Sequence, residues 1–557
     1  MAGISIRPTG SPVRARSAKA WAASAIRISG VPLSGSWPEI EAPNERSTSS
    51  SLCERRDWLS RPSSQVTGSR QVTVRTTSRS SRAPTTARIV PIVRRLTRPS
   101  LGSPPGPGRR YYRPMGRAMK SCLLAGAAFL LLGGVAQASP RQMTFTSQEI
   151  TVDGYAVEKA ITAGVARPPG DGFITAMAAD VVDPKTGRDV PISRIMLHHI
   201  VFAAYGNGPG NRPFYGDGEE RAVMKLPPGY GYRVEAADKW AIVWMLMNHR
   251  AQADSVKIRW TLTWDDDPTL KPVTPMAFDA SRGRQGLVYD VPGGGRPGSS
   301  DVRTHVRQAP FNGRIVAGLG HVHGGAYELT LSQPACDDRT LYRSRPTWGL
   351  ASHPFYNVKP VLHEPGPINM SRLESATGIP VRSGEELKLS SVYDNSRLHT
   401  RAMGLMLVYL ARDEDVPSGC ASLPQDVRNI GTETPGRSRP PVYRVPLTGI
   451  GPRGLARTIS RPPGALLRGS LAASLSIGDS FYTRPNVSIR RGGTVTWKFT
   501  GDLQHDVTVA DGPRGFSSDW QKKGTSFTRR FDVPGRYKLF CSLHPVQMTQ
   551  VVTVRPR

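Results

Sequence analysis

The chain has 557 residues, enough for about three to five domains of ordinary size. It carries 74 lysine and arginine residues against 43 aspartate and glutamate residues, a formal charge of +31. With only five cysteines in this length, the sequence excludes a small cysteine-rich scaffold. All 11 histidines lie after residue 197, so any site built from imidazole groups belongs to that part of the chain.

Much of the positive charge lies in residues 1–118, which hold 20 arginines and one lysine against five acidic residues. The segment is rich in Arg, Ser, Thr, Pro and Gly and has little hydrophobic periodicity. Such a composition cannot bury enough apolar surface to offset the entropy of ordering the chain. We therefore expect a spurious or disordered extension. A basic arm for nucleic acid is the alternative, but no aromatic pattern or folded nucleic-acid module accompanies the charge, so no nucleic-acid partner is expected.

A short apolar run follows this extension. Residues 123–135 (LLAGAAFLLLGGV) come after a small basic region and precede the small residues 136–138 (AQA), in the order of a secretory signal peptide. We expect translation to begin at Met115 or Met119, residues 119–138 to be removed, and the mature protein to be periplasmic or secreted. A genuine N-terminal extension is the alternative. The run is too short to span a bilayer, so no membrane span is expected after cleavage.

Export would leave three cysteines in the mature chain. In an oxidising compartment, Cys336 and Cys420 are candidates for a disulfide bond. Cys541 is then unpaired, which points to another role for its thiol.

From residue 139 the sequence reads as β-structure. Runs such as SVKIRWTLTW and LKLSSVY alternate polar and apolar residues between turn-forming segments, and no helical periodicity is sustained. The expected fold class is all-β: two tandem β-sandwiches of jelly-roll type followed by a smaller Greek-key sandwich. The expected boundaries are 139–290 and 291–420 for the two sandwiches, 421–468 for a Pro/Arg-rich linker, and 469–557 for the last domain.

Four side chains in the last domain form a recognisable ligand set. His505 lies in LQHDVTV, and Cys541, His544 and Met548 lie in CSLHPVQM. Two imidazoles, one thiolate and a weak thioether are the ligands of a type 1 (blue) copper site that transfers electrons. A strand can deliver the thiolate, the following loop can return His544 and Met548 to the same ion, and a remote strand can supply His505. The alternative is a free buried cysteine near two surface histidines.

This domain resembles the cupredoxins, in particular the plastocyanin and amicyanin-like group. The resemblance implies that His505, Cys541 and His544 are the strong copper ligands and that Met548 is the axial ligand. Because the spacing between the histidine and the methionine varies in the family, Gln547 is the alternative axial ligand. The resemblance also implies one-electron exchange with a redox partner.

A second set of candidate ligands lies in the two large sandwiches: His198 and His199 in IMLHHIVF, His249 in WMLMNHR, His321 and His323 in GLGHVHGG, and Met403 in RAMGLMLVYL. An HxH pair on a strand places both imidazoles on one face, which makes a natural chelate. Two histidines and a methionine suit Cu(I). Adjacent residues on a regular strand point to opposite faces, so the HH pair can share an ion only at a strand end or a β-bulge.

The order HH, His, HxH and Met resembles that of the ascorbate-dependent type II copper monooxygenases, the peptidylglycine and dopamine hydroxylases. The resemblance implies that His198, His199 and His249 bind a copper ion that relays electrons. It also implies that His321, His323 and Met403 are catalytic ligands of a second copper ion that activates O2 toward an organic substrate. A small-molecule reductant such as ascorbate would supply the electrons.

The expected function is therefore that of an exported copper-dependent monooxygenase with a fused electron-transfer domain. The alternative is a non-catalytic electron-transfer protein in which the sandwiches are a binding scaffold. A multicopper oxidase or nitrite reductase relative is disfavoured, because the sequence has a single HxH pair. The remaining histidines are expected to be structural or on the surface: His305, His353, His363 and His399, of which His399 stands out by lying four residues before Met403.

Overall fold

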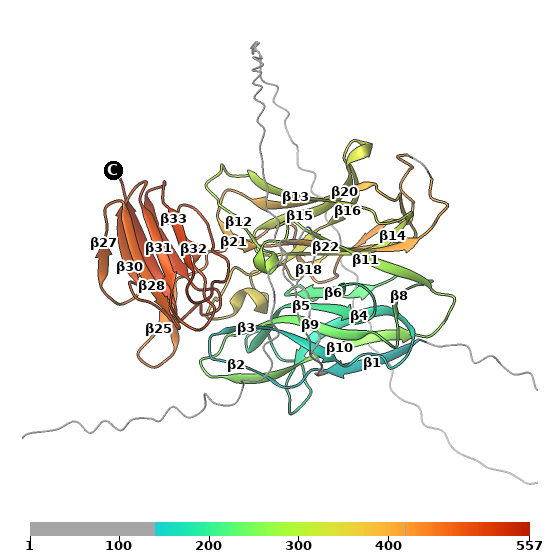
Figure 1. Ribbon diagram of the computed structural model, residues 1–557, viewed down its shortest axis with the longest axis horizontal. Coiled ribbons are helices and arrows are strands. Elements are labelled where there is room, and N and C mark those ends of the chain that lie inside the picture. The colour runs from blue at the N-terminus through green and yellow to red at the C-terminus, as the bar shows by residue number, and fades with distance from the viewer. Residues whose placement is uncertain (1–139, 418) are drawn as a thin grey trace, which may run out of the picture. The chain divides into compact units, whose positions relative to one another are not determined.

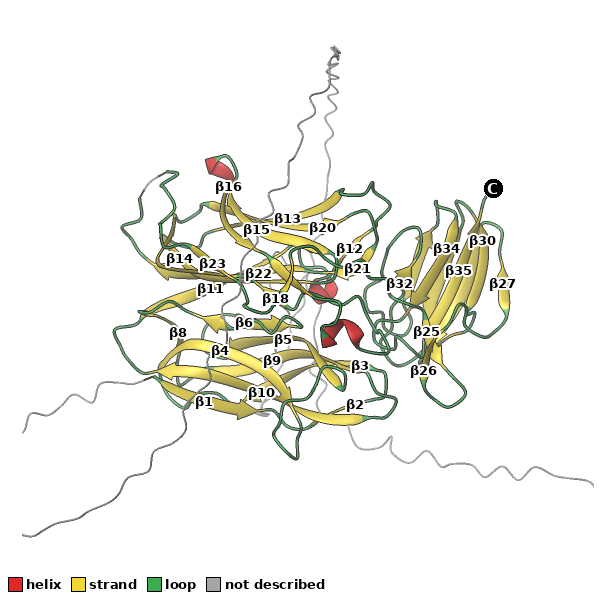
Figure 2. Ribbon diagram, turned by 180° about the vertical axis from the view of Figure 1, so that it is seen from behind, coloured by secondary structure: helices red, strands yellow, loops and turns green. Residues whose placement is uncertain are grey.

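The computed structural model describes residues 140–417 and 419–557. The predicted N-terminal extension and signal peptide lie outside these residues. The described chain is nearly all β-structure, with three short 3-10 turns, η1 (Gln285–Leu287), η2 (Pro334–Cys336) and η3 (Pro354–Asn357) (Figure 2). The expected all-β fold class is confirmed. Within the described residues, no helix is long and apolar enough to cross a membrane.

The largest sheet has 11 strands in the order β1-β10-β4-β8-β11-β22-β14-β19-β23, with β2 and β7 paired to β10 and β4. Its strands are β1 (Arg141–Thr146), β2 (Ile150–Val152), β4 (Gly172–Val182), β7 (Met224–Lys225), β8 (Tyr230–Val234), β10 (Asp254–Asp265), β11 (Lys271–Asp279), β14 (Gly313–Val322), β19 (Arg372–Val381), β22 (Gly404–Arg412) and β23 (Arg428–Ile430). The alternation in SVKIRWTLTW appears directly in β10, where buried residues such as Ile258 and Trp260 alternate with more exposed ones.

Two four-stranded sheets pack against this large sheet. One has the order β3 (Val157–Val165), β9 (Lys239–Asn248), β5 (Ile195–Tyr205) and β6 (Arg212–Gly218). The other has the order β13 (Ser300–Gln308), β20 (Glu386–Asp394), β15 (Ala326–Gln333) and β16 (Arg339–Ser344). Both faces of β5 are buried or half-buried, so its histidines lie inside the molecule.

The two sandwiches share the large sheet instead of following each other as separate units. Strand β8 pairs with β11 over Lys271–Val273, and β11 pairs with β22 along its length. The second sandwich therefore begins near residue 271, earlier than the expected boundary at 290/291. Strand β6 also contacts β22, and the Tyr409 hydroxyl of β22 donates a hydrogen bond to the Phe214 carbonyl of β6 (2.9 Å). Figure 1 shows β6 next to β22 and β11; β5 pairs with β6, and β14 pairs with β22.

Residues 421–468 are not a free linker as expected. Their strands β23 and β24 (Gly436–Arg437) pair with β19 and with β17 (Pro346–Gly349). Strand β27 (Leu466–Arg468) already belongs to the last domain, because it pairs with β30 (Asn486–Arg490). The other small pairings join β18 (Asn369–Met370) to β17, β12 (Tyr289–Val291) to β21 (His399–Ala402), and β25 (Thr448–Ile450) to β26 (Ala456–Thr458).

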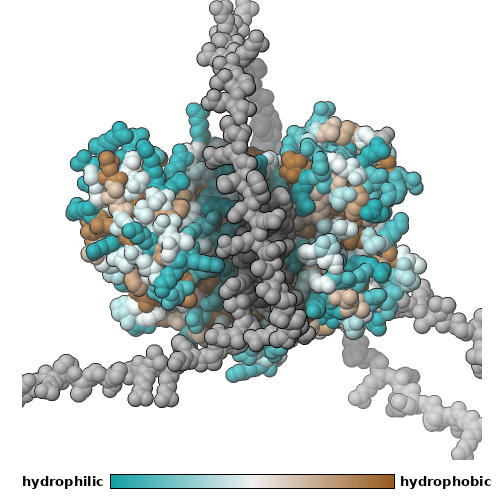
Figure 3. Space-filling view, viewed as in Figure 1, coloured by the Kyte–Doolittle hydropathy of each residue, from teal (hydrophilic) through white to brown (hydrophobic). Residues whose placement is uncertain are grey.

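The last domain contains two sheets. The first has the order β27, β30, β35 (Thr549–Arg555), β34 (Gly535–Phe540) and β32 (Thr508–Asp511); the second has the order β29 (Phe481–Tyr482), β28 (Ala472–Gly478), β31 (Thr494–Phe499) and β33 (Ser526–Arg530). Trp497 is fully buried in its core and donates from Nε1 to Gln550 Oε1 (2.8 Å). On the face drawn in Figure 3, hydrophilic residues predominate and hydrophobic ones form small separate patches.

The disulfide expected between Cys336 and Cys420 is present. It closes a loop across 84 residues of sequence, so it restricts the unfolded chain considerably. Replacing both cysteines by serine is expected to lower the free energy of unfolding by about 2–4 kcal/mol. Urea unfolding of the variant and of the unsubstituted protein measures the difference. An unchanged midpoint at unchanged slope would contradict the expectation.

Candidate metal centres

The C-terminal cluster brings together His505, Cys541 and His544. Cys541 directly follows β34, His544 lies in the turn before β35, and His505 precedes β32. The Cys541 Sγ atom lies 3.8 Å from His505 Nδ1 and 3.8 Å from His544 Nδ1. A sulfur at about 2.3 Å and a nitrogen at about 2.0 Å from one ion in a trigonal plane are about 3.8 Å apart, so the three donors fit a common ion.

Met548 lies beside this cluster, fully buried before β35. Its backbone N–H donates to the His544 carbonyl (3.0 Å), and its carbonyl accepts from the Cys541 N–H (3.1 Å), so the loop that carries the ligands closes on itself. Gln547 instead donates from Nε2 to the Gly154 carbonyl (2.9 Å). The Oε1 atom of Gln547 is buried and has no hydrogen-bond partner among the described residues, so Met548 as the axial ligand, with Gln547 as the alternative, stays a prediction.

Two aspartates that the sequence did not single out hold the C-terminal cluster. His505 Nε2 donates to Asp479 Oδ1 (3.4 Å), and the fully buried Asp506 accepts from the Ser542 N–H (2.6 Å). Burial, and next the charge of Asp506, raises the pKa of the Cys541 thiol well above its usual range. A bound cation would have to displace that proton, as metal binding to cysteine generally does.

The HH pair lies in the middle of β5, where a regular strand would point the two side chains to opposite faces. The pairing of β5 with β9 shifts register between Leu197 and His199, which places a β-bulge at His198. The two imidazole centroids are consequently only 3.9 Å apart. The bulge that the sequence required for a shared site is therefore present.

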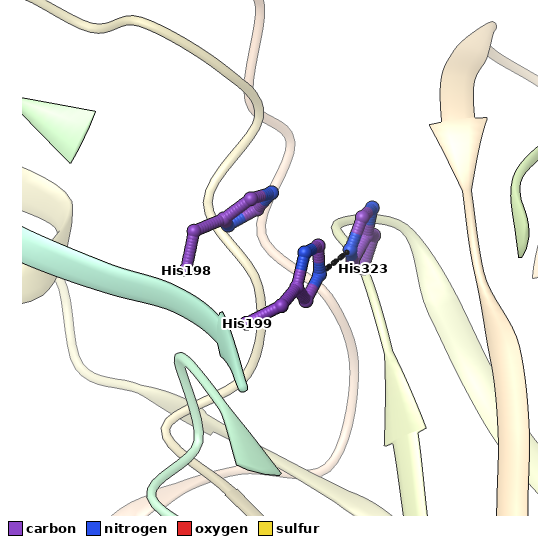
Figure 4. Close-up of side chains that lie close together, drawn as sticks. All are labelled: His198, His199 and His323. Atoms are coloured by element: carbon purple, nitrogen blue, oxygen red, sulfur yellow. Dashed lines mark hydrogen bonds between the residues drawn. The ribbon is translucent and has the colours of Figure 1, made fainter. Parts of the chain in front are cut away.

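The HxH pair lies at the end of β14 and meets the HH pair directly. His323 Nε2 is 2.8 Å from His199 Nε2, and the His198 and His323 ring centroids are 5.2 Å apart (Figure 4). The His199 and His321 centroids are 5.0 Å apart. The structure thus gathers both pairs in one cluster, where the sequence suggested two separate sites. His198, His199 and His323 have donor atoms within 4.8 Å of one another.

The present His199–His323 contact is a hydrogen bond between two ring nitrogens. Two nitrogens bound at about 2.0 Å to one tetrahedral ion are about 3.3 Å apart. A small opening of this pair would therefore admit a metal ion in place of the shared proton.

The Nδ1 atoms of three of the expected ligand histidines are held by oxygen acceptors, although His249 belongs to none of the donor groups found among the described residues. His323 donates to the Arg401 carbonyl (2.7 Å), His321 to the Glu220 carboxylate (2.8 Å), and His249 to the Pro360 carbonyl (3.1 Å). The Nε2 atoms of His249 and His321 are buried and have no hydrogen-bond partner in the described chain. An acceptor on one ring nitrogen and a free second nitrogen is the arrangement that metal-binding histidines adopt, so these residues fit a metal ion.

Sequence reasoning missed Glu219, and it placed His363 among the structural histidines. Glu219 Oε1 accepts from His198 Nδ1 (2.5 Å) and from His363 Nε2, and these three residues form a further potential donor set. The signal was the acidic pair in GDGEE. Because His199 pairs with Gly218 in the β5–β6 ladder, the residues after Gly218 must lie beside the HH pair.

Burial tunes the imidazoles toward the neutral form that binds metal. It lowers the pKa of His199 and His323 well below the usual range, and neighbouring histidines lower it further. His321 differs: burial opposes the charged form, but the Glu220 carboxylate outweighs it and the pKa is raised. The negative charges of Glu219 and Glu220, directly after β6, thus offset positive charge on the histidine cluster.

Metal-free protein is expected to lose stability as the pH falls from about 6.5 to about 4. Burial is the main cause that lowers the pKa of both His249 and His544 to about 4. Between these pH values the two histidines bind protons in the unfolded chain but stay neutral in the folded chain. Falling pH therefore favours unfolding. Thermal unfolding of chelator-treated protein across this window tests the expectation. His249→Gln should flatten the dependence, and an unchanged slope in that variant would contradict it.

A cavity of about 80 Å³ is lined by members of the histidine cluster and by chain neighbours of the C-terminal donors. Its wall includes His199, His323 and Met403 on one side and Ser542 and Leu543, which follow Cys541, on the other. Met403 is buried at the end of β21, next to the start of β22. The expected methionine therefore shares a cavity with the histidine cluster.

The other histidines divide into two kinds. His305 and His353 accept backbone N–H groups of Asp279 (2.9 Å) and Phe355 (3.3 Å), which are structural roles. His399 is instead fully buried, donates to Glu364 (2.7 Å), and has an Nε2 atom without a partner among the described residues. It is therefore not a surface residue.

Comparisons with known proteins find two similarities, each over part of the chain. Residues 247–413 match the family described as SURNod19, stress up-regulated Nod 19; this span contains His249, the HxH pair and Met403. Over 85 residues, 14% of this chain and 71% of the relative, the chain is 29% identical to amicyanin-alpha of Methylorubrum extorquens (strain ATCC 14718 / DSM 1338 / JCM 2805 / NCIMB 9133 / AM1).

Solved structures of amicyanin mutants are also similar over a short span. One in the Cu(I) form is 25% identical and covers 15% of this chain and 83% of its own, with a TM-score of 0.14. One in the reduced state is 25% identical and covers 15% and 82%, with the same TM-score. The chain thus shows partial similarity to amicyanin over a short span, and its residues 247–413 match the SURNod19 family.

Proposed function

We propose that this chain is an exported copper-dependent oxidoreductase. In the proposal, the C-terminal cluster holds a type 1 copper ion, and the histidine cluster between β5 and β14 holds the copper at which O2 attacks an organic substrate. The observation that carries the proposal is a cavity lined by His198, His199 and His323 of the histidine cluster and by Ser542 and Leu543, which lie between the C-terminal donors Cys541 and His544 in the chain. A carrier fused to the same chain supplies electrons at a high effective concentration.

The residues of the chain divide the work. His505, Cys541, His544 and Met548 would hold the electron-transfer copper, a ligand set typical of such sites. The cavity-lining side chains of His198, His199, His323 and Met403 would hold the second copper ion. Hydroxylation of a C–H bond by O2 consumes two electrons beyond those of the substrate bond, so a reductant such as ascorbate or a redox protein must reload the C-terminal site.

Export is supported by the disulfide between Cys336 and Cys420. Disulfides persist in the periplasm and outside the cell, whereas the cytosol keeps thiols reduced. We therefore place the mature protein in the periplasm or the medium. Fractionation of cells that express the full gene, probed for the disulfide-bonded chain, tests this placement.

A non-catalytic electron carrier is the second candidate. The small cavity favours it, since about 80 Å³ holds O2 and a few waters or a small organic molecule but not a large substrate. In this alternative the histidine cluster stores copper or an electron without turnover.

Copper stoichiometry together with EPR and visible spectra separates the candidates. The proposal expects an intense blue band and at least two copper ions per chain, one or more of them with a type 2 signal, followed by O2 consumption with ascorbate in a substrate screen. A blue band with a single copper ion would reduce the sandwiches to a scaffold. Full copper loading without turnover would favour the electron carrier.

Met403→Leu is expected to abolish hydroxylation and to leave the blue band unchanged. Leucine has nearly the same volume but no sulfur, so the cavity stays filled while the Cu(I) ligand is lost. Substrate turnover and the visible spectrum, measured on the same preparation, check both halves. The neighbouring Met406→Leu is the matched control, because Met406 is buried in the β11–β22 ladder. Retained turnover in Met403→Leu would remove Met403 from the site.

A further inference from the structure

Hydrogen bonds and short covalent segments link the two metal clusters through the largely buried ion pair of Asp506 and Arg401. We propose that Asp506 and Arg401 form the route by which an electron passes from the C-terminal copper to the histidine cluster. The inference rests on the function proposed above. It gives a role in electron transfer to Asp506 and Arg401, which belong to neither of the two predicted sets of copper ligands.

In the first half of the route, Asp506 is linked to two copper ligands of the C-terminal site, His505 and Cys541. Asp506 directly follows the ligand His505 in the chain. Its Oδ1 atom accepts the N–H of Ser542 (2.6 Å), the residue that follows the ligand Cys541. Asp506 is fully buried. The Asp506 carboxylate is therefore linked to Cys541 by the hydrogen bond from Ser542, and to His505 through the backbone.

The second half leads from this carboxylate to the histidine cluster. Arg401 Nη1 donates to Asp506 Oδ2 (3.1 Å), and the backbone carbonyl of the same arginine accepts from His323 Nδ1 (2.7 Å). His323 in turn contacts His199 through its other ring nitrogen. Arg401 thus contacts both Asp506, beside the C-terminal cluster, and His323 of the histidine cluster.

Trp520 makes a parallel connection. Its indole N–H donates to Ser542 Oγ (3.2 Å), and the Arg401 guanidinium lies 4.4 Å from the centroid of its ring system. Ser542 and Arg401 are therefore linked both through a carboxylate and through an aromatic ring. All three residues Arg401, Trp520 and Ser542 line the cavity between the clusters.

The energetics of the pair also call for a role beyond stability. The side chains of Arg401 and Asp506 are 12% and 0% exposed, and a buried ion pair gives little net stabilisation, because desolvation offsets the attraction. Electronic coupling falls less steeply through covalent and hydrogen bonds than across van der Waals gaps. A buried, hydrogen-bonded pair between two redox ions is therefore well placed to carry an electron.

The step is a balanced one-electron exchange. A copper ion held at the C-terminal cluster would give up one electron, and a copper ion held at the histidine cluster would accept it. No bond forms or breaks and no proton is transferred. The electron enters the C-terminal copper from the external reductant.

Pulse radiolysis of the copper-loaded full-length protein without O2 tests the route. The carbon dioxide radical anion reduces the C-terminal Cu(II), and the return of the visible band then reports the internal transfer at a rate independent of protein concentration. We expect Arg401→Gln to slow that rate by about tenfold or more, the size of effect that the loss of one outer partner has at metal sites. Arg401→Lys, which keeps a donor to Asp506, should recover part of the rate. The visible spectrum should stay unchanged, and the midpoint potential of the C-terminal site is measured for each variant so that a change in driving force is separated from a change in coupling.

Arg284→Gln is the matched control. Arg284 also reaches the last domain, donating to Asp519 (3.1 Å) and to the Ser517 carbonyl (2.9 Å), but it contacts neither cluster. An equal slowing of the internal transfer in Arg284→Gln would show that the rate depends on how the last domain packs on the sandwiches. That result would overturn the route. An unchanged rate in Arg401→Gln would overturn it as well. If the unsubstituted protein shows no return of the band and binds a single copper ion, the proposed function itself fails, and the route fails with it.

Discussion

Cys541→Ser is expected to abolish the blue absorption band of the copper-loaded protein. The band of a type 1 site arises from charge transfer between the thiolate and copper, and serine offers neither the sulfur nor a low-energy donor orbital. The two Sγ–Nδ1 separations of 3.8 Å make Cys541 the common neighbour of His505 and His544, so its loss removes the centre of the cluster. Visible and EPR spectra after copper addition measure the result. We expect a weak type 2 signal or no bound copper at this site.

The paired Cys336→Ser and Cys420→Ser substitutions are the control. Those two sulfurs form the disulfide and lie outside the cluster, so the blue band should persist in that variant. A band that survives in Cys541→Ser would show that the chromophore lies elsewhere in the chain.

His323→Ala is expected to remove one copper ion per chain and to leave the blue band intact. His323 contacts His199, and its ring lies beside the rings of His198 and His321. Its Nδ1 atom donates a hydrogen bond to the Arg401 carbonyl. Deleting it takes a donor from the middle of the cluster. We expect copper affinity to fall by more than about 100-fold, the upper end of what loss of an outer partner causes, because a direct ligand is lost. Copper titration followed by EPR measures the stoichiometry.

His305→Gln is the matched control for this experiment. His305 lies on β13 and accepts a backbone N–H from Asp279, away from the cluster. Its replacement should leave the copper count unchanged. Equal loss of copper from both variants would mean that the count reports general unfolding, and full loading of His323→Ala would remove His323 from the ligand set.

The all-β class followed from the sequence alone, because alternating runs such as SVKIRWTLTW have the period of a half-buried strand. The C-terminal donor set was also readable, since three of its four residues lie within eight positions of one another, from Cys541 to Met548. Local spacing is enough to predict a site when one loop carries most of its ligands.

Domain boundaries were less accessible. The end of the first sandwich depends on the parallel pairing of β8 with β11 over three residues, and long-range strand pairing leaves no signal in local composition. Residues 421–468 read as a linker because they are rich in proline and arginine. Their short strands nevertheless pair with β17, β19 and β30.

The histidine cluster shows the same division most clearly. The sequence by itself named the candidate donors of the HH pair, the HxH pair and Met403, and four of these residues line one cavity: His198, His199, His323 and Met403. Only the tertiary structure decided their grouping. The bulge at His198 turns two neighbouring imidazoles to one side, and the packing of β6 on β22 brings β5 to β14, so residues 124 positions apart meet at 2.8 Å. The Asp506–Arg401 pair likewise joins residues 105 positions apart. Such contacts follow from the packing of whole sheets, and no local sequence pattern encodes them.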